Sequence, residues 1–156
     1  MLDISKVLKY SEFFKGINQA ALTEIAECCI HLSLPAGTQL ITQDTEGDYD
    51  FYILTRGEVH IIYNYMDYLG RMNEMIFTAL EREVVGEISA LLHCKRTATV
   101  RCKTPIEAIQ VNGISFMNYL ELHHDVGFAI MRNAALMLSR RLANTTILLK
   151  ERITMI

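Results

Sequence analysis

Apolar residues recur along this chain at two different spacings, and the changes of spacing divide it into three parts. In the first part, apolar residues three and four positions apart indicate an amphipathic helix that Asn18 can cap. Its apolar positions are Leu22, Ile25, Ala26 and Cys29. Pro35-Ala36-Gly37 would stop any continuation. We therefore expect residues 1–34 to be helical.

The second part, residues 35–111, is predicted to form short strands. Six segments are rich in β-branched and aromatic residues, and turns separate several of them. The expected strands are residues 38–42, 49–54, 58–65, 74–80, 98–103 and 106–111. Short strands at this spacing are typical of a barrel or sandwich, which a helical turn at residues 88–92 interrupts.

The third part, residues 112–156, returns to helical spacing. A short helix is expected over residues 114–122, and Asp125 can cap a long helix that runs toward Glu151. The apolar positions of the long helix are Val126, Ile130, Ala134, Met137, Leu138, Leu142 and Leu149. They form two faces, one expected to pack on the β region and the other left for a ligand or a second chain. The chain is thus predicted to be one α+β domain, mainly β.

Composition and charge narrow the class of protein. The chain has 156 residues, and 51% of them are apolar, enough for a buried core. Its apolar runs are too short to span a membrane, and its start does not resemble a signal sequence, so we expect a cytoplasmic protein. A net charge of −3 gives no general attraction to nucleic acid or anionic lipid.

The four cysteines form no Cys-x-x-Cys pair, so reduced thiols are expected. Cys28, Cys29 and His31 could in principle hold a metal or an iron-sulfur cluster. The simpler interpretation is a buried helix end in which cysteine acts as a small hydrophobe. We prefer the simpler interpretation and expect no metal site.

Residues 85–100 carry the candidate ligand chemistry. Gly86 lets the backbone approach a ligand closely, and a helical turn starting near Ile88 would aim the amides of Ser89 and Ala90 at an anion. Arg96 could place its guanidinium on two phosphate oxygens.

Glu87 adds an acceptor nine positions before Arg96. When ionised it suits a ribose hydroxyl, and a carboxylate beside a phosphate makes little sense without such a donor. The pair therefore favours a nucleotide over a bare phosphate.

This segment resembles the phosphate-binding cassette of cyclic nucleotide-binding domains, because Gly86, Glu87, Arg96, Thr97 and Ala98 stand in the register of that motif. Upstream, residues 47–59 resemble the strand-turn-strand signature of the family, and Pro35-Ala36-Gly37 resembles the start of its barrel. The resemblance covers roughly residues 14–149. It implies a jelly-roll-like β roll, residues 35–111, with N-terminal helices, a short cassette helix and C-terminal helices.

The resemblance also implies a ligand site and a role. The implied site residues are Gly86, Glu87, Ile88, Ser89, Ala90, Arg96, Thr97 and Ala98. They would make the chain a sensor or regulatory domain that converts binding of cAMP or cGMP into movement of its C-terminal helix. Thr97 is compatible with either nucleotide. We expect cAMP, because bacterial relatives with such a helix mostly use it.

Two positions depart from the family pattern. Val85 replaces the usual aromatic residue, and Arg82 stands where a turn glycine is common. A positive φ would cost arginine on the order of 1 kcal/mol. We therefore expect the loop at Arg82 to follow a different path.

The C-terminal helix and the polar residues of the cassette suggest further expectations. Residues 137–142 resemble the dimer helix of bacterial catabolite-activator-type regulators, so we expect a homodimer. Ser89 and His93 lie one helical turn apart without a third orienting group, so no catalytic residues and no enzyme activity are expected.

Three alternatives share the fold. The chain could be the sensor half of a DNA-binding transcription regulator, although the twelve residues after Asn144 are too few for a helix-turn-helix. It could be a regulatory module of a channel or kinase. It could also be a ligand-free dimerisation module, in which Glu87 and Arg96 would pair with each other.

Overall fold

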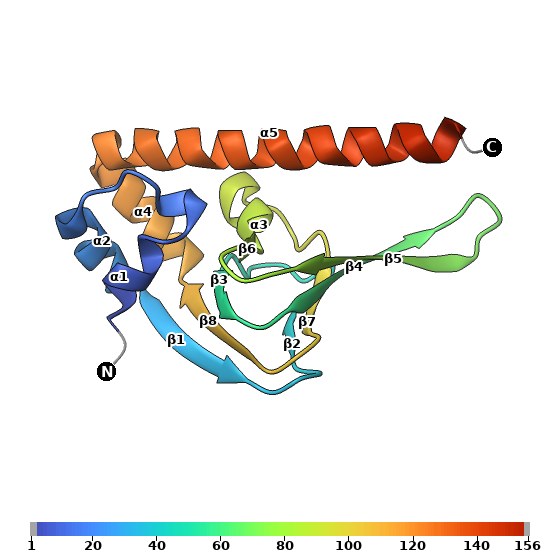
Figure 1. Cartoon of the computed structure of the whole chain (residues 1–156), viewed down its shortest axis with the longest axis horizontal. Helices are drawn as coiled ribbons and strands as arrows, with labels where there is room; N and C mark the ends of the chain where they lie inside the picture. Colours follow the sequence, from blue (N-terminus) through green and yellow to red (C-terminus); the bar gives the residue numbers. More distant parts are fainter. Residues whose placement is uncertain (1–2, 155–156) are drawn as a thin grey trace.

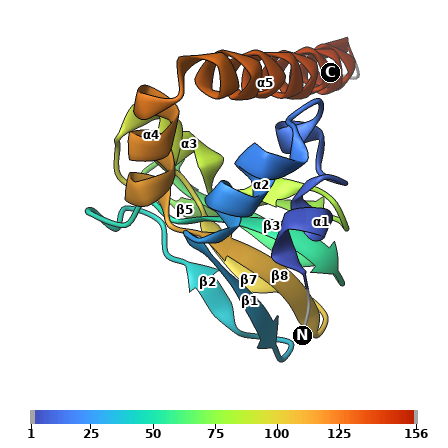
Figure 2. The ribbon, with the colours of Figure 1, turned by 90° about the vertical axis from the view of Figure 1, so that its left-hand side faces the viewer.

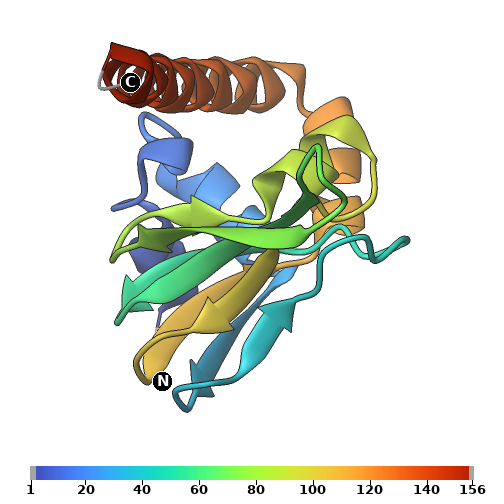
Figure 3. The same ribbon diagram turned by 90° about the vertical axis from the view of Figure 1, so that its right-hand side faces the viewer.

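The strands form two antiparallel sheets that face each other in a β roll (Figure 3). The computed structural model describes residues 3–154, and in this part of the chain each sheet has four strands. The first sheet has the order β1 (Cys29–Leu34), β8 (Ile106–Val111), β3 (Phe51–Arg56), β6 (Val84–Val85). The second has the order β2 (Gln39–Ile41), β7 (Thr99–Cys102), β4 (Val59–Met66), β5 (Met72–Ala79). The jelly-roll-like β roll is therefore confirmed.

The inner strand β3 of the first sheet is buried on both faces. Phe51, Tyr52, Ile53 and Leu54 of β3 are all buried, although they point alternately to opposite sides. Phe51 and Ile53 belong to the core under the helices, whereas Tyr52 and Leu54 belong to the core between the sheets. The continuous apolar run in the sequence thus reflects a strand between two cores.

Helices cover the outer side of this sheet (Figures 1 and 2). The N-terminal elements are α1 (Ile4–Leu8), the short 3-10 helix η1 (Glu12–Phe14) and α2 (Gln19–Ala26), and the C-terminal ones are α4 (Gly113–Leu122) and α5 (His124–Thr154). Asn18 caps α2 as predicted, since its side chain accepts a hydrogen bond of 2.9 Å from the Ala21 amide. Asn112 caps α4 in the same way.

Aromatic edge-to-face contacts join the helices to the sheet. Phe13, Phe14 and Phe116 pack against Phe51 or against one another, with ring centroids 5.2 to 6.1 Å apart. The inward face of α5, whose members are Val126, Ile130, Ala134 and Met137, completes this core. Helix α5 therefore packs mainly on α4 and η1, and it shares this core with residues of β3 in the roll. No described helix is long and apolar enough to cross a membrane.

Two expectations about local structure are wrong, and one short strand was not predicted. Residues 29–34, expected to be helical, form β1, because pairing with β8 along six residues outweighs the weak helical spacing. The short strand β6 carried too few residues to be predicted. Asp125 does not cap α5, which begins one residue earlier and places Asp125 in its first turn.

The expected detour of the loop at Arg82 is also wrong. Arg82 adopts φ = 72°, the left-handed conformation that glycine usually takes there. Its amide donates to the Leu54 carbonyl at 2.7 Å, and the Leu54 amide donates to the Glu83 carbonyl at 3.0 Å. These two backbone hydrogen bonds fix the turn whatever the side chain, so the strain is retained.

We predict that Arg82→Gly stabilises the protein. Glycine relieves the left-handed strain but has more conformational freedom in the unfolded chain. The net effect should raise the free energy of unfolding by about 0.5–1 kcal/mol. The thermal midpoint should rise by about 1–4 °C. Arg82→Ala is the control, because it removes the same charge but keeps a Cβ atom and should give no gain. A lower midpoint for Arg82→Gly than for Arg82→Ala would contradict this account.

Candidate functional site

The cassette begins at a position that only glycine fits. Gly86 has φ = 84° and lies immediately before α3 (Glu87–Leu92). A Cβ atom there would lie 2.7 Å from Ile41 Cδ1 and 3.2 Å from Arg96 Nη1. Because α3 starts at Glu87, the Ser89 amide lacks an intrahelical acceptor, whereas the amide of Ala90 is the first that has one. The predicted role of the Ala90 amide is thus not supported.

One cavity collects most of the predicted site residues. Gly86, Glu87, Ile88, Ser89, Arg96, Thr97 and Ala98 line it, together with Ile41, Ile61, Tyr63, Val85, Val100 and Arg141. Ala90 is the exception, since it faces a different cavity between α3 and α4. The cavity beside Glu87 and Arg96 measures about 50 Å³. It therefore has room for about one or two water molecules.

Arg96 is almost completely buried at one end of this cavity, with 1% of its surface exposed. Its Nη2 donates to Asp48 Oδ1 at 2.7 Å and to the Asp50 carbonyl at 2.5 Å, and Nη1 donates to the Gly86 carbonyl at 3.1 Å. Its Nε is buried without a hydrogen-bond partner. The guanidinium is thus held by three hydrogen bonds, and its Nε still has an N–H to donate.

Asp50 stabilises the backbone around Arg96. Its carboxylate accepts hydrogen bonds from Gln110 Nε2 at 2.6 Å and from the Gly113 amide at 3.1 Å. These contacts connect the loop before β3 to the end of β8 and the start of α4. The position of the arginine therefore depends on the junction of three elements.

Glu87 is buried at the same cavity and pairs with an arginine from α5. It is 2% exposed, and its Oε1 accepts a hydrogen bond from Arg141 Nη1. Arg141 Nη2 also donates to the Val84 carbonyl at 2.8 Å. One guanidinium thus joins α5 to the cassette and to β6.

The burial of Glu87 affects its titration. Burial raises the pKa of this carboxyl above its usual value, and the charge of Arg141 opposes the shift. A raised pKa in the folded state means that the ionised form costs stability. That cost appears as the pH rises through the raised pKa. Arg141 is therefore the group that most stabilises the charged form of the buried Glu87 carboxyl.

Ser89 and His93 do not form a catalytic pair. Ser89 Oγ lies 3.5 Å from the Lys95 carbonyl, whereas the His93 ring stacks on Tyr49 with centroids 4.1 Å apart. The cysteines at the end of α2 are also accounted for by packing, since both thiols donate to the Ile25 carbonyl. Residues 3–154 contain no group of three or more potential metal ligands.

Two residues at the site were missed by sequence reasoning. Arg141 was predicted only as part of residues 137–142, which resemble a dimer helix. It stands four positions after Met137 on the buried face of α5, where a charged residue needs a partner. Asp48 lay in a recognised motif but was given no role. The ligand-free alternative predicted a pair between Glu87 and Arg96, whereas each is paired with a different residue.

Comparisons with known proteins agree with the fold and the cassette. The model of the cyclic nucleotide-binding domain family matches residues 31–123. The potassium channel AKT1 of rice (Oryza sativa) is 25% identical over 132 residues, which are 85% of this chain but 14% of the channel. The chain thus spans a small part of that relative's length.

Two solved structures share the fold at lower identity. A cyclic nucleotide-binding domain from Methylobacillus flagellatus has a TM-score of 0.75 at 16% identity, over 90% of this chain and 77% of that one. The regulatory domain of a Toxoplasma gondii protein kinase A with cAMP has a TM-score of 0.68 at 17% identity, over 85% and 48%. The family match covers more than half of the chain and includes the cassette. This protein therefore belongs to the cyclic nucleotide-binding domain family, whose domains are regulatory.

Proposed function

We propose that this chain is a sensor domain that binds a cyclic nucleotide in the cavity between Arg96 and Glu87, with cAMP preferred over cGMP. The observation that carries the proposal is the buried guanidinium of Arg96, whose Nε has no partner. A buried donor without an acceptor is rare in proteins, and a phosphate oxygen is an acceptor that suits arginine.

Each wall of the cavity suits one part of such a ligand. Arg96 and the backbone at Gly86 and Ser89 would hold the cyclic phosphate. Glu87 would accept a ribose hydroxyl, as a carboxylate buried beside an anion site requires a donor. The apolar side chains of Ile41, Ile61, Val85 and Val100 form the remaining wall and would contact the sugar and base. Nothing in this set suits bond-making chemistry, so the proposed role is binding alone.

The route from the ligand to the C-terminal helices would run through α3. Leu91 packs against the helical core together with Met117 of α4, whereas Leu92 is 70% exposed. A shift of α3 on ligand binding would change the packing of Leu91 on α4 and so move α5. A ligand can shift such an equilibrium only through its different affinity for the two states.

We also propose that the protein is located in the cytoplasm. All four cysteines lie within the described residues and carry free thiols. Free thiols are usual in reducing compartments. The same domain could serve as a module of a longer regulator, channel or kinase, because the ligand site would be the same in each.

We also propose that the chain forms a homodimer through α5. Beyond Arg141 every described residue of α5 is exposed, and the helix extends in the same direction as the β4–β5 hairpin (Figure 1). A stripe with alternating spacings of four and three runs along it: Met131, Ala135, Leu138, Leu142, Thr145 and Leu149. This heptad spacing is what a second copy of the same helix requires for coiled-coil packing.

The first test of the proposal is calorimetric titration with cAMP and cGMP. We expect the wild-type protein to bind cAMP with micromolar or tighter affinity and cGMP more weakly. Arg96→Ala should weaken binding by about 100-fold, because loss of a charge-assisted pair in a buried site costs about 3 kcal/mol. Arg96→Lys keeps the charge but not the fork and should lie between the two.

Arg101→Ala is the matched control for the Arg96 variants. Arg101 lies on β7 and is exposed, away from the cavity, so its loss should leave affinity unchanged. Thermal melting of each variant separates lost binding from lost folding. Absence of binding by the folded wild-type protein, or equal affinity of Arg96→Ala and the wild type, would refute the proposed site.

The dimer is tested by sedimentation velocity at micromolar concentration. The wild type should sediment as a dimer, and Leu149→Glu should sediment as a monomer because it places like charges across the stripe. Ile147→Glu is the control, since Ile147 is 54% exposed against 55% for Leu149 but lies off the stripe. A monomeric wild type, or dimers of both variants, would contradict the proposed interface.

A further inference from the structure

We propose that Arg141 occupies the ribose end of the ligand site from within the chain and competes with the nucleotide for Glu87. This inference rests on the proposed function and adds the residue through which α5 and the ligand exclude each other. Arg141 would be a positioning residue, because it holds α5 on the cassette until the ligand displaces it.

The contacts of Arg141 are those that a ligand hydroxyl would need. Its Nη1 donates to Oε1 of Glu87, which is the only carboxylate among the described residues that line the cavity. Its Nη2 donates to the Val84 carbonyl at 2.8 Å, so both ends of the guanidinium are engaged. The arginine and a ribose hydroxyl are both donors, and they would compete for the lone pairs of the same carboxylate.

The size of the cavity also supports competition between Arg141 and the nucleotide. With Arg141 in place the cavity measures about 50 Å³. Pockets for ligands of nucleotide size measure roughly 300 Å³ or more. The Arg141 side chain is one of the walls that limit the space, and its departure would open the site toward α5. Exclusion is therefore steric as well as electrostatic.

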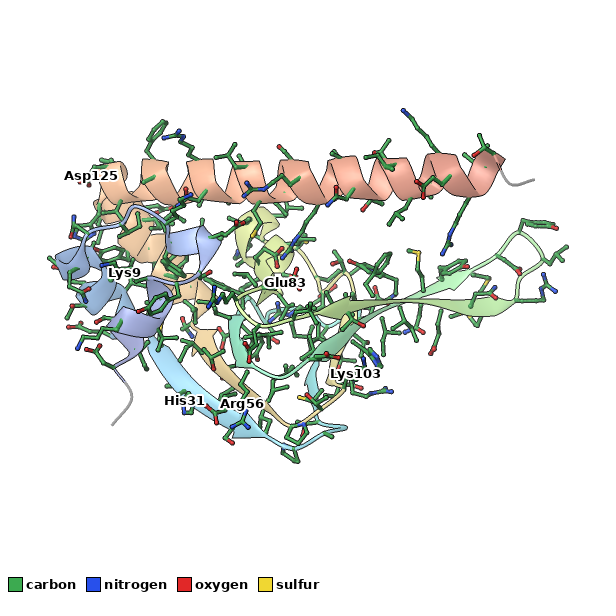
Figure 4. All side chains as sticks on the ribbon, viewed as in Figure 1. Lys9, His31, Arg56, Glu83, Lys103 and Asp125 are labelled. Atoms are coloured by element: carbon green, nitrogen blue, oxygen red, sulfur yellow. The ribbon has the colours of Figure 1, made fainter. Side chains whose placement is uncertain are left out.

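Among the described residues, Arg141 is also the last one of α5 that makes a hydrogen bond or ion pair with the rest of the domain. Earlier contacts are made in the first half of the helix, where Asn133 donates to the Phe13 and Lys15 carbonyls, and about two turns later, where Arg140 pairs with Glu12 at 3.0 Å. All described residues after Arg141 are exposed, and their side chains project from the helix (Figure 4). Loss of the contact with Glu87 would therefore free the second half of α5 from the roll.

The two events are linked by thermodynamic reciprocity. If release of Arg141 is required for nucleotide binding, the apparent affinity equals the affinity of the released state multiplied by the fraction of molecules in which Arg141 is displaced. Conversely, the nucleotide must increase the released fraction of α5 by the same factor. A population of one tenth or less for the released state implies a loss of about tenfold or more in affinity.

The experiment compares three variants with the full wild-type chain by titration with cAMP and cGMP. Arg141→Met removes the guanidinium but keeps an apolar stem, and it should bind the preferred nucleotide at least about tenfold more tightly. Arg141→Lys leaves a cation near Glu87 without the forked contact to Val84 and should give a smaller gain. Arg141→Lys also provides a second test if Arg141→Met fails to fold because Glu87 has lost its partner.

Arg140→Met is the matched control. Arg140 is the neighbouring residue, loses the same charge and is absent from the cavity lining. The nucleotide affinity of Arg140→Met should equal that of the wild type. In addition, amide hydrogen exchange of unliganded Arg141→Met should be faster in α5 beyond Met137, and saturating nucleotide should produce the same change in the wild type.

The outcomes separate this inference from the proposed function. Equal or weaker binding by both Arg141 variants, when the wild type binds, would overturn the competition but leave the ligand site intact. Failure of all four proteins to bind either nucleotide would refute the proposed function and the competition together. Tighter binding by Arg140→Met of the same size as that of Arg141→Met would also overturn the inference, because the effect would then be one of general charge.

Discussion

The burial of opposite charges on one small cavity is the constraint on which the rest of this structure depends. Glu87 and Arg96 are 2% and 1% exposed, and a buried charge without compensation would cost several kcal/mol. The chain compensates each of them from elsewhere, with Arg141 of α5 for the acid and Asp48 of the loop before β3 for the arginine. The cavity therefore couples the cassette to two distant segments.

The two pairs differ in what they connect. Asp48 and the Asp50 and Gly86 carbonyls belong to the roll and its cassette, so they fix Arg96 within one rigid body. Arg141 belongs to a helix that is anchored on α4 and η1 and has few other contacts with the roll. The proposed phosphate end of the site is thus preorganised, whereas the proposed ribose end depends on the position of α5. The affinity of a ligand that contacts both ends would therefore depend on the position of that helix.

Much of this arrangement could be predicted from the sequence, and the failures have physical reasons. The roll and the cassette have strong local signals, namely β-branched strands, Gly86, and an acid and an arginine at fixed spacing, and these were predicted within a few residues. The strand β1 was missed because only its pairing with β8 distinguishes it from a helix end. Arg82 was misjudged because two backbone hydrogen bonds impose a conformation that its own preference opposes.

The partners of Glu87 and Arg96 could not be predicted from local spacing, because they lie 54 and 48 positions away along the chain. The sequence indicates such a partner in another way, by a charged residue that lies on an otherwise apolar face of a helix. Arg141 continues a buried stripe that begins with Val126 and reaches Met137, and a cation in such a stripe requires an acid opposite it.

The same helix carries the heptad stripe on an adjoining face, and Leu142 directly follows Arg141. A turn of α5 that withdraws the arginine would therefore also reorient the stripe. Ligand binding and assembly would then act on one rigid element, so a signal would need no further relay between them.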